Sequence, residues 1–288
     1  MTQTFGFDKS ADEAVRIWNY NAGKWPFVGS PWRPSDGDIA IYRKSLEARY
    51  IQSAAVFGAT PEIRDFLAKL KLASKPTIVD SSADMLSSMS KLLKIASPIN
   101  ETCVKADWCE APLPAELFDV VIGDMIWWVV SVEKQERLSA TIKRILRPNG
   151  LFVSRFRIRD EGKVLDDPKR IITGYLDQFR LGRRDEQSLR DEMMSKVYDS
   201  TVDAANKRID REKTRQILTE MIDESIDGKI RAFLETTRER LLGSNWTSQT
   251  KEEILGPLKQ HFKLETEGHA EDYESGTYPI FAFRKIRI

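Results

Sequence analysis

Short apolar runs alternate with amphipathic stretches in the central part of the chain, between about residues 51 and 160. The runs predict buried strands, and the stretches between them carry apolar residues at helical spacing. Strands that alternate with helices are typical of β-α-β units and a parallel sheet. Crossovers in such units are right-handed in nearly all proteins, so few topologies remain. The predicted strands here are Ser53–Phe57, Thr77–Asp80, Cys103–Ala106, Phe118–Asp124 and Leu151–Ser154.

The first 50 residues predict a helical and aromatic segment. A helix is expected over Ala11–Ala22, followed by an aromatic, proline-rich passage over Trp25–Pro34. A second helix is expected from Ser35 or Asp36 to about Arg49. Ser and Asp are good N-caps, and acidic residues in a first turn suit the helix dipole.

Charged helical sequence replaces the strand–helix alternation between residues 161 and 247. This segment is too long to be a simple connection within a compact sheet domain, so we interpret it as a helical insertion. From residue 248 the pattern returns to a helix and two strands. The helices expected in the insertion begin near Pro168 and cover Asp185–Ala205, Arg211–Glu224 and Gly228–Leu242. The last expected elements are a helix from Thr250 to His261 and strands at Phe262–Glu267 and Tyr278–Lys285.

The composition permits a globular core and argues against a general nucleic-acid binder. Hydrophobic residues make up 41%, and 45 basic residues nearly balance 44 acidic ones, whereas nucleic-acid binders are usually basic. No apolar stretch reaches the length of a membrane span, and no signal peptide is visible, so a cytoplasmic location is expected. Cys103 and Cys109 give neither a metal nor a disulfide framework, and Cys103 is expected in the core.

Polar residues stand where the predicted strands end. The first strand runs into a turn at Gly58, and Asp80, Asp107 and Asp124 end or follow later strands. In an open parallel sheet, ligands bind outside the carboxyl ends of the strands. A glycine there lets the backbone approach a ligand without a Cβ in the way. The series therefore predicts a site for a nucleoside-like ligand.

This series resembles the class I S-adenosylmethionine-dependent methyltransferases over residues 51–155 and 248–288. The turn Gly58–Glu62 resembles a Gly-Ala-Thr-Pro-Glu variant found in a bacterial subset of that family. Val56, Thr60 and Glu62 stand where the family usually has an acidic residue and two glycines.

The resemblance implies an α/β fold with a Rossmann-like, mostly parallel seven-stranded sheet, an N-terminal helical segment and a helical insertion after strand five. The final two strands would form an antiparallel hairpin. Residues 1–50 would cap a cofactor-binding core of residues 51–160. Residues 161–247 would be the insertion, and residues 248–288 would complete the core.

The resemblance also implies a cofactor, S-adenosyl-L-methionine, with S-adenosyl-L-homocysteine as the product. Asp80 would accept hydrogen bonds from the ribose hydroxyls, unless it merely caps a turn. Glu62 would bind the methionine ammonium, unless it only suits the helix dipole. Asp107 would accept a hydrogen bond from the adenine amino group. The implied cofactor-binding residues are Gly58, Ala59, Thr60, Glu62, Asp80, Ser81, Met85, Asp107, Trp108, Asp124 and Met125.

Asp124 is also the candidate catalytic residue, because a carboxylate at this strand end can bind an ammonium or orient a nucleophile. Tryptophan rings favour a cationic sulfonium, although one of the two that follow Asp124 is expected to be structural. The N-terminal aromatic passage is either a lid over the acceptor or ordinary packing. The expected acceptor-binding residues are Trp25, Trp32, Arg33, Tyr42, Trp127 and Trp128.

These residues predict methyl transfer to a small-molecule acceptor, with no metal, nucleic-acid or membrane partner. The insertion is expected to cover the acceptor pocket or to mediate a homodimer. Arg155, Arg157 and Arg159 either bind an acidic substrate or form a solvated strand edge. Two alternatives remain: an enzyme that uses another part of the cofactor and releases methylthioadenosine, and a non-catalytic cofactor-binding regulator.

Overall fold

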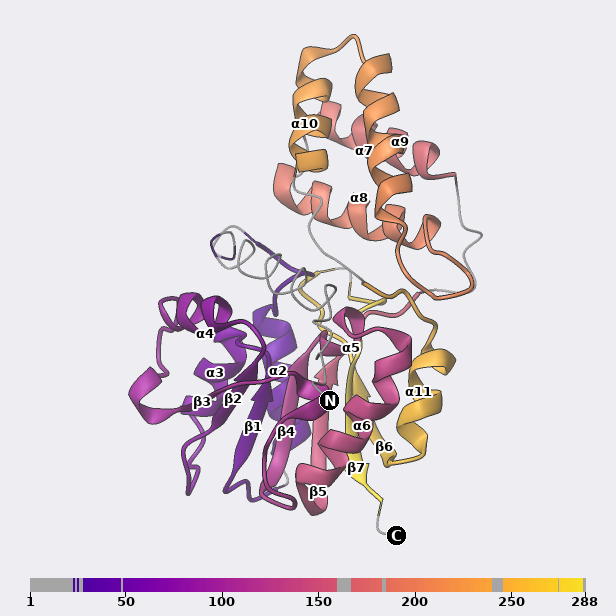
Figure 1. Ribbon diagram of the computed structural model, residues 1–288. Coiled ribbons are helices and arrows are strands. Elements are labelled where there is room, and N and C mark those ends of the chain that lie inside the picture. Colours follow the sequence, from indigo (N-terminus) through magenta and orange to yellow (C-terminus); the bar gives the residue numbers. More distant parts are fainter. Residues whose placement is uncertain are drawn as a thin grey trace, which may run out of the picture.

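In the part of the chain that the computed structural model describes, seven strands form one sheet with helices on both faces (Figure 1). The described residues are 23, 25, 28–47, 49–159, 167–182, 185–239, 246–273 and 275–286. The strand order is β3-β2-β1-β4-β5-β7-β6. β1 to β5 pair in parallel, whereas β7 is antiparallel to both β5 and β6. This confirms the predicted Rossmann-like sheet and its terminal hairpin. The strands are Ala54–Phe57 (β1), Thr77–Asp80 (β2), Thr102–Lys105 (β3), Phe118–Asp124 (β4), Leu146–Arg155 (β5), Phe262–Gly268 (β6) and Ile280–Lys285 (β7).

Two apolar cores follow from the alternation of side chains along the strands. Ala54 and Val56 face the helices α2, α3 and α4, whereas Ala55 and Phe57 face α6 and α11. The central strands β1 and β4 are therefore apolar on both faces, as expected for a covered parallel sheet. These helices are Asp36–Leu46 (α2), Pro61–Ala68 (α3), Ala83–Ser90 (α4), Val132–Ile145 (α6) and Lys251–Lys259 (α11).

Cys103 corrects one sequence-based expectation. It lies on the edge strand β3 and is exposed, whereas Cys109 is buried. The prediction of a core position was wrong because β3 has a partner only on the β2 side and little cover from helices.

The insertion forms a third apolar core above the carboxyl edge of the sheet (Figure 1). Met125, Trp128 and Tyr278 reach into this core from the sheet domain. The predicted helix Arg211–Glu224 is confirmed, whereas the one expected to Ala205 ends at Ser200. The helix expected over Ala11–Ala22 lies outside the described residues. The helices of the insertion are Pro168–Leu181 (α7), Glu186–Ser200 (α8), Arg211–Glu224 (α9) and Gly228–Glu239 (α10).

No helix in the described part of the chain is both long and apolar enough to cross a membrane.

A buried ion pair secures the helices beside the first strands. Arg64 on α3 donates to both oxygens of Glu101, which precedes β3, and to the hydroxyl of Ser90 at the end of α4 (2.9 Å). Both charged side chains are almost completely buried. Removing one partner of such a pair leaves an uncompensated charge in the interior.

Arg64→Ala should therefore lower the free energy of unfolding by about 3–5 kcal/mol, measured by urea denaturation. The matched control is Arg180→Ala, because Arg180 forms an exposed pair with Asp177 on the surface of α7. This control should change stability little. Equal losses in the two variants would show that the buried pair does not matter.

Candidate functional site

The turn after β1 brings the backbone to the carboxyl edge of the sheet. Gly58 has φ +98°, a conformation that residues with a Cβ rarely adopt, and its N–H donates to Val79 O at 2.8 Å. Ala59 and Thr60 are buried, and α3 begins at Pro61. The amide groups of a helix N-terminus thus adjoin the end of β1.

Glu62, in the first turn of α3, joins this turn to the N-terminal segment. Its Oε1 accepts hydrogen bonds from Nε (2.7 Å) and Nη2 of Arg33. Its Oε2 is buried and has no hydrogen-bond partner among the described residues. An unpaired buried acceptor is rare in folded proteins and requires an explanation. The structure thus brings together two residues that the sequence analysis assigned separately.

Asp80 ends β2 as a buried carboxyl group. Its Oδ1 accepts the backbone N–H of Ser82 at 2.8 Å, which is the turn role considered for it. Burial raises the pKa of Asp80 to about 7, and the hydrogen bond from Ser82 opposes this shift only in part. A carboxylate has about four acceptor positions, so this one retains capacity for further donors.

Asp107 and Trp108 follow β3. Asp107 is exposed, and its Oδ1 accepts the N–H of Cys109 at 2.9 Å. Trp108 donates from Nε1 to Val79 O at 2.8 Å and stacks on Phe57 with 6.4 Å between ring centroids. Trp108 is therefore held beside Gly58.

Met85 and Ser81 lie at the start of α4. Met85 is 5% exposed and packs in the core under α2, α3 and α4, while its N–H donates to Ser82 Oγ at 3.0 Å. Ser81 is half-buried in the turn after β2. Met85 therefore packs in the core, and its contact with the cofactor stays a prediction.

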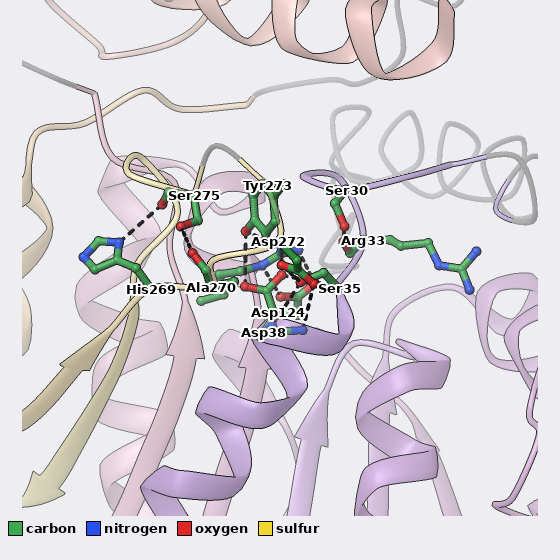
Figure 2. A network of polar contacts seen from close by, with 12 residues as sticks. Ser30, Arg33, Ser35, Asp38, Asp124, His269, Ala270, Asp272, Tyr273 and Ser275 are labelled. Carbon is green, nitrogen blue, oxygen red and sulfur yellow. Dashed lines mark hydrogen bonds and ion pairs between the residues drawn. The ribbon is translucent and has the colours of Figure 1, made fainter. Parts of the chain in front are cut away.

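Asp124, at the end of β4, belongs to a buried network of charges (Figure 2). Arg155 Nε donates to Asp124 Oδ1 at 2.8 Å, and its Nη2 donates to Oδ2 at 3.1 Å. Arg155 Nη1 donates to Asp38 Oδ2 at 2.7 Å. Burial raises the pKa of Asp124 to about 6, although the guanidinium of Arg155 opposes the shift. Both carboxylate oxygens of Asp124 are therefore engaged in the ion pair with Arg155.

The loop between β6 and β7 completes this network (Figure 2). Asp272 accepts the hydroxyl hydrogen of Ser35 (2.8 Å) and the N–H of Gly37 (2.9 Å), so it caps α2 from a distant part of the chain. Tyr273 OH donates to Asp38 Oδ1 at 3.2 Å. The sequence analysis missed Asp38, Asp272 and Tyr273 as site residues. The contacts of Asp38 with Arg155, and those of Asp272 and Tyr273 with α2, join residues far apart in the sequence, so no local pattern signals them.

The arginines near the end of β5 correct another expectation. Arg155 and Arg157 are 0% and 3% exposed, so the interpretation as a solvated strand edge is wrong for these two residues. Arg155 is paired with Asp38 of α2 and Asp124 of β4, and it also donates to the hydroxyl of Tyr273 in the β6–β7 loop. Arg157 pairs with Asp199 of the insertion.

The two tryptophans after β4 separate into different cores. Trp127 is 1% exposed and packs with the sheet, whereas Trp128 packs with the insertion. Trp32 of the N-terminal segment stacks on Trp128, with 5.0 Å between ring centroids and 18° between planes. Met125, between Asp124 and the tryptophans, has φ 54° and is buried against the insertion.

Tyr42 and Trp25, which were also expected to bind the acceptor, contact other parts of the protein. Tyr42 is fully buried; its hydroxyl donates to Gly123 O at 2.8 Å and accepts the N–H of Arg155 at 2.9 Å. It has no exposed surface to offer a ligand. Trp25 is partly buried against the core under α2, α3 and α4, and its carbonyl accepts a 3.5 Å hydrogen bond from Arg33. Within the described residues, no cluster of His, Cys, Asp or Glu is arranged to hold a metal ion.

Comparison with known proteins gives a family match for part of the chain. Residues 60–150 match the model of a family described as a methyltransferase domain. This segment contains Glu62, Asp80, Asp107 and Asp124. No curated protein matches the sequence.

Solved structures with the same fold are distant in sequence. The N-methyltransferase NodS from Bradyrhizobium japonicum WM9, in complex with S-adenosyl-L-homocysteine, has a TM-score of 0.52 at 11% identity and covers 97% of this chain and 100% of its own. A second similar structure is a chain from the Haloferax volcanii complex between the Trm112 methyltransferase activator and a methyltransferase. Its TM-score is 0.53 at 8% identity, and the match covers 97% of this chain and 99% of that one. A Rhodobacter sphaeroides protein described as a Zn-dependent alcohol dehydrogenase has a TM-score of 0.59 at 18% identity. The match covers 98% of this chain and 100% of that one.

The strand order agrees with this family match. β6 and β7 form the antiparallel hairpin that the resemblance implied, and the matched residues run from the turn after β1 to the middle of β5. Residues 60–150 are thus similar to a methyltransferase domain, and the described residues form a Rossmann-like sheet.

Proposed function

We propose that this protein transfers a methyl group from S-adenosylmethionine to a small-molecule acceptor. The observation that carries the proposal is a pair of carboxyl groups near the Gly58 turn: Asp80, which is buried, and Glu62, which is half-buried with a buried Oε2. Each has acceptor capacity that the described residues leave unused. Both belong to the segment that matches a methyltransferase domain.

The chemistry of these groups fits the cofactor. Asp80 is buried beside a turn and can accept hydrogen bonds from two ribose hydroxyls. The orphaned Oε2 of Glu62 can accept a hydrogen bond from the methionine ammonium, while Arg33, paired with the other oxygen, offers a positive charge for the carboxylate. The ion pair is thus complementary to an amino-acid zwitterion. The positive φ of Gly58 would allow close approach of the backbone.

The site residues would act mainly by positioning and by excluding water. S-adenosylmethionine supplies a methyl group already activated by its sulfonium, and alignment can provide a large part of the rate of such a displacement. Asp38 and Asp124 together outnumber the guanidinium of Arg155 by one negative charge, which favours a cation nearby. Trp32 and Trp128 stack beneath the insertion, and this aromatic cover supports a small acceptor over a polymer.

Binding and product analysis test the proposal directly. Calorimetry should give micromolar affinity for S-adenosylmethionine or S-adenosylhomocysteine and none for NAD. With a methyl-labelled cofactor and an ultrafiltered cell extract, the label should pass to a small molecule and S-adenosylhomocysteine should accumulate. Methylthioadenosine would instead mean that the aminobutyl chain is used. If neither sulfur nucleoside bound, the cofactor assignment would be lost.

Asp80 should make cofactor binding dependent on pH. Because its folded-state pKa is raised to about 7, the protonated form predominates at lower pH, and affinity should rise with pH until the carboxylate forms. Below that pKa the loss should approach tenfold per pH unit, at about 1.4 kcal/mol for each unit. Asp80→Asn should bind about tenfold more weakly at pH 8 and show no such dependence.

Stability of the ligand-free protein provides the complementary measurement. A raised carboxyl pKa stabilises the fold while the group is protonated, and this contribution is lost as the pH rises through about 7. The stability of the parent protein relative to Asp80→Asn should therefore fall between about pH 4 and 7. Asp84→Asn, an exposed change in the first turn of α4, is the control and should alter neither profile.

Glu62→Gln should lower the affinity for both S-adenosylmethionine and S-adenosylhomocysteine by at least about tenfold. Both ligands carry the amino-acid ammonium, which loses a charged hydrogen bond in this variant. Methylthioadenosine lacks the amino acid, so its affinity should not change. Calorimetry with the three ligands measures this pattern. An equal loss for methylthioadenosine would mean that the substitution disturbs the turn rather than the ammonium contact.

A further inference from the structure

Two buried N–H donors at the carboxyl edge of the sheet have no partner among the described residues. They are Nε1 of Trp128, after β4, and Nε of Arg157, after β5. Trp128 is 6% exposed and Arg157 is 3% exposed. The guanidinium carbon of Arg157 lies 5.7 Å from the centre of the Trp128 ring, so the two side chains are neighbours. Buried donors are almost always paired, so an unpaired pair of neighbouring donors requires an explanation, and a ligand acceptor is one.

The remaining nitrogens of Arg157 are firmly held, which fixes the orientation of the guanidinium. Nη1 donates to Asp199 Oδ1 at 2.9 Å and to Ser248 Oγ at 3.1 Å, and Nη2 donates to Ser195 O at 2.6 Å. The Nε edge is therefore the part of Arg157 that remains for a ligand.

Flat aromatic surfaces surround these donors. Trp32 stacks on Trp128, and the centroid of Trp246 lies 4.0 Å from that of Trp128 at 31°. Tyr198 meets Trp246 edge-on at 5.6 Å. Trp32 is half-buried and belongs to a different segment from the residues it contacts. Stacked indole faces favour planar, unsaturated groups over saturated ones of similar size.

The charges at this edge disfavour an anion. Arg155 and Arg157 face three carboxylates, Asp38, Asp124 and Asp199, so one negative charge is already in excess when all are ionised. A buried carboxylate on a ligand would add to that excess. An uncharged carbonyl oxygen accepts the same hydrogen bonds without adding charge.

We propose that Trp128 Nε1–H and Arg157 Nε–H bind the uncharged carbonyl oxygen of a planar aromatic acceptor. This inference rests on the proposed methyl transfer, since it names the class of molecule that would be methylated. Arg157, rather than Arg155, is the arginine available to an acceptor, because both carboxylates beside Arg155 hold its guanidinium. Met125 N–H donates to Arg155 O at 2.9 Å, which ties the segment that carries Trp128 to the end of β5.

Three small probes test the subsite: benzamide, benzoate and benzylamine. They are titrated into the full-length protein saturated with S-adenosylhomocysteine, and the indole ¹H–¹⁵N signal of Trp128 is followed after its assignment with Trp128→Phe. Benzamide should shift this signal saturably, with an affinity at least about tenfold higher than that of benzoate or benzylamine. The proposal is overturned if benzamide has no effect up to its solubility limit, or if either charged probe binds equally well.

A pair of matched variants separates hydrogen bonding from packing. Trp128→Phe and Trp127→Phe each remove one buried, unpaired indole N–H, but Trp127 lies in the core of the sheet. Calorimetry should show benzamide affinity falling about tenfold in Trp128→Phe, as expected for one lost hydrogen bond with a buried partner, and unchanged in Trp127→Phe. Equal effects would refute the assignment.

Arg157→Lys keeps the positive charge but loses Nε–H. It should lower the affinity for benzamide about as much as Trp128→Phe does. Unchanged affinity would remove Arg157 from the subsite. The titrations are repeated without S-adenosylhomocysteine. Failure of S-adenosylhomocysteine to bind would then count against the proposed function, whereas failure of benzamide alone would count against this subsite.

Discussion

Arg155 lies between two buried carboxylates at the carboxyl end of β5, and the arrangement of the site depends on this contact. Asp38 comes from α2 and Asp124 from β4, while Tyr42 and Tyr273 contribute hydroxyl groups. A charge in a protein interior is tolerated only when it is paired and hydrogen-bonded. Loss of Arg155 would leave two uncompensated carboxylates. The N-terminal segment, the sheet and the β6–β7 loop are therefore held in one arrangement by a single side chain.

Arg157 holds the helical insertion to the end of β5 in a similar way. It is two residues beyond Arg155, and its partners Ser195 and Asp199 lie on α8. The apolar core of the insertion also receives Trp128 and Tyr278 from the sheet domain. The insertion is thus fixed over the carboxyl edge by both charge and apolar packing. In the proposed function, this cover keeps water away from the reacting groups.

Adjacent residues in the N-terminal segment link the two sides of the site. Trp32 stacks on Trp128, beside the proposed acceptor subsite, and Arg33 pairs with Glu62 in the turn proposed for the cofactor. The peptide bond between them couples these contacts, so movement of one side chain constrains the other. Cofactor binding at Glu62 would in this way favour the arrangement of aromatics that receives the acceptor.

The sequence by itself determined the fold class and approximately where β1 to β4 end, because both follow from local patterns. The start of β5 was predicted at Leu151 but lies at Leu146. Alternating apolar runs and helical stretches predicted the parallel sheet, and the positions of Gly58, Asp80, Asp107 and Asp124 followed from where the runs stop. The helix start was predicted at Ser35 or Asp36, and Ser35 is the N-cap, with a capping box to Asp38.

Only the tertiary structure decided how these residues are paired. The contact between Asp272 and the start of α2, and the two ion pairs of Arg155, join residues distant in the chain, so no spacing in the sequence signals them. The burial of individual residues also could not be predicted from the sequence. Cys103 is exposed on an edge strand, Arg155 is buried between Asp38 and Asp124, and Arg157 is buried against the insertion. A local pattern specifies which face of an element is apolar. The position of that element in the fold determines what covers the face, and hence which charged groups lose contact with water.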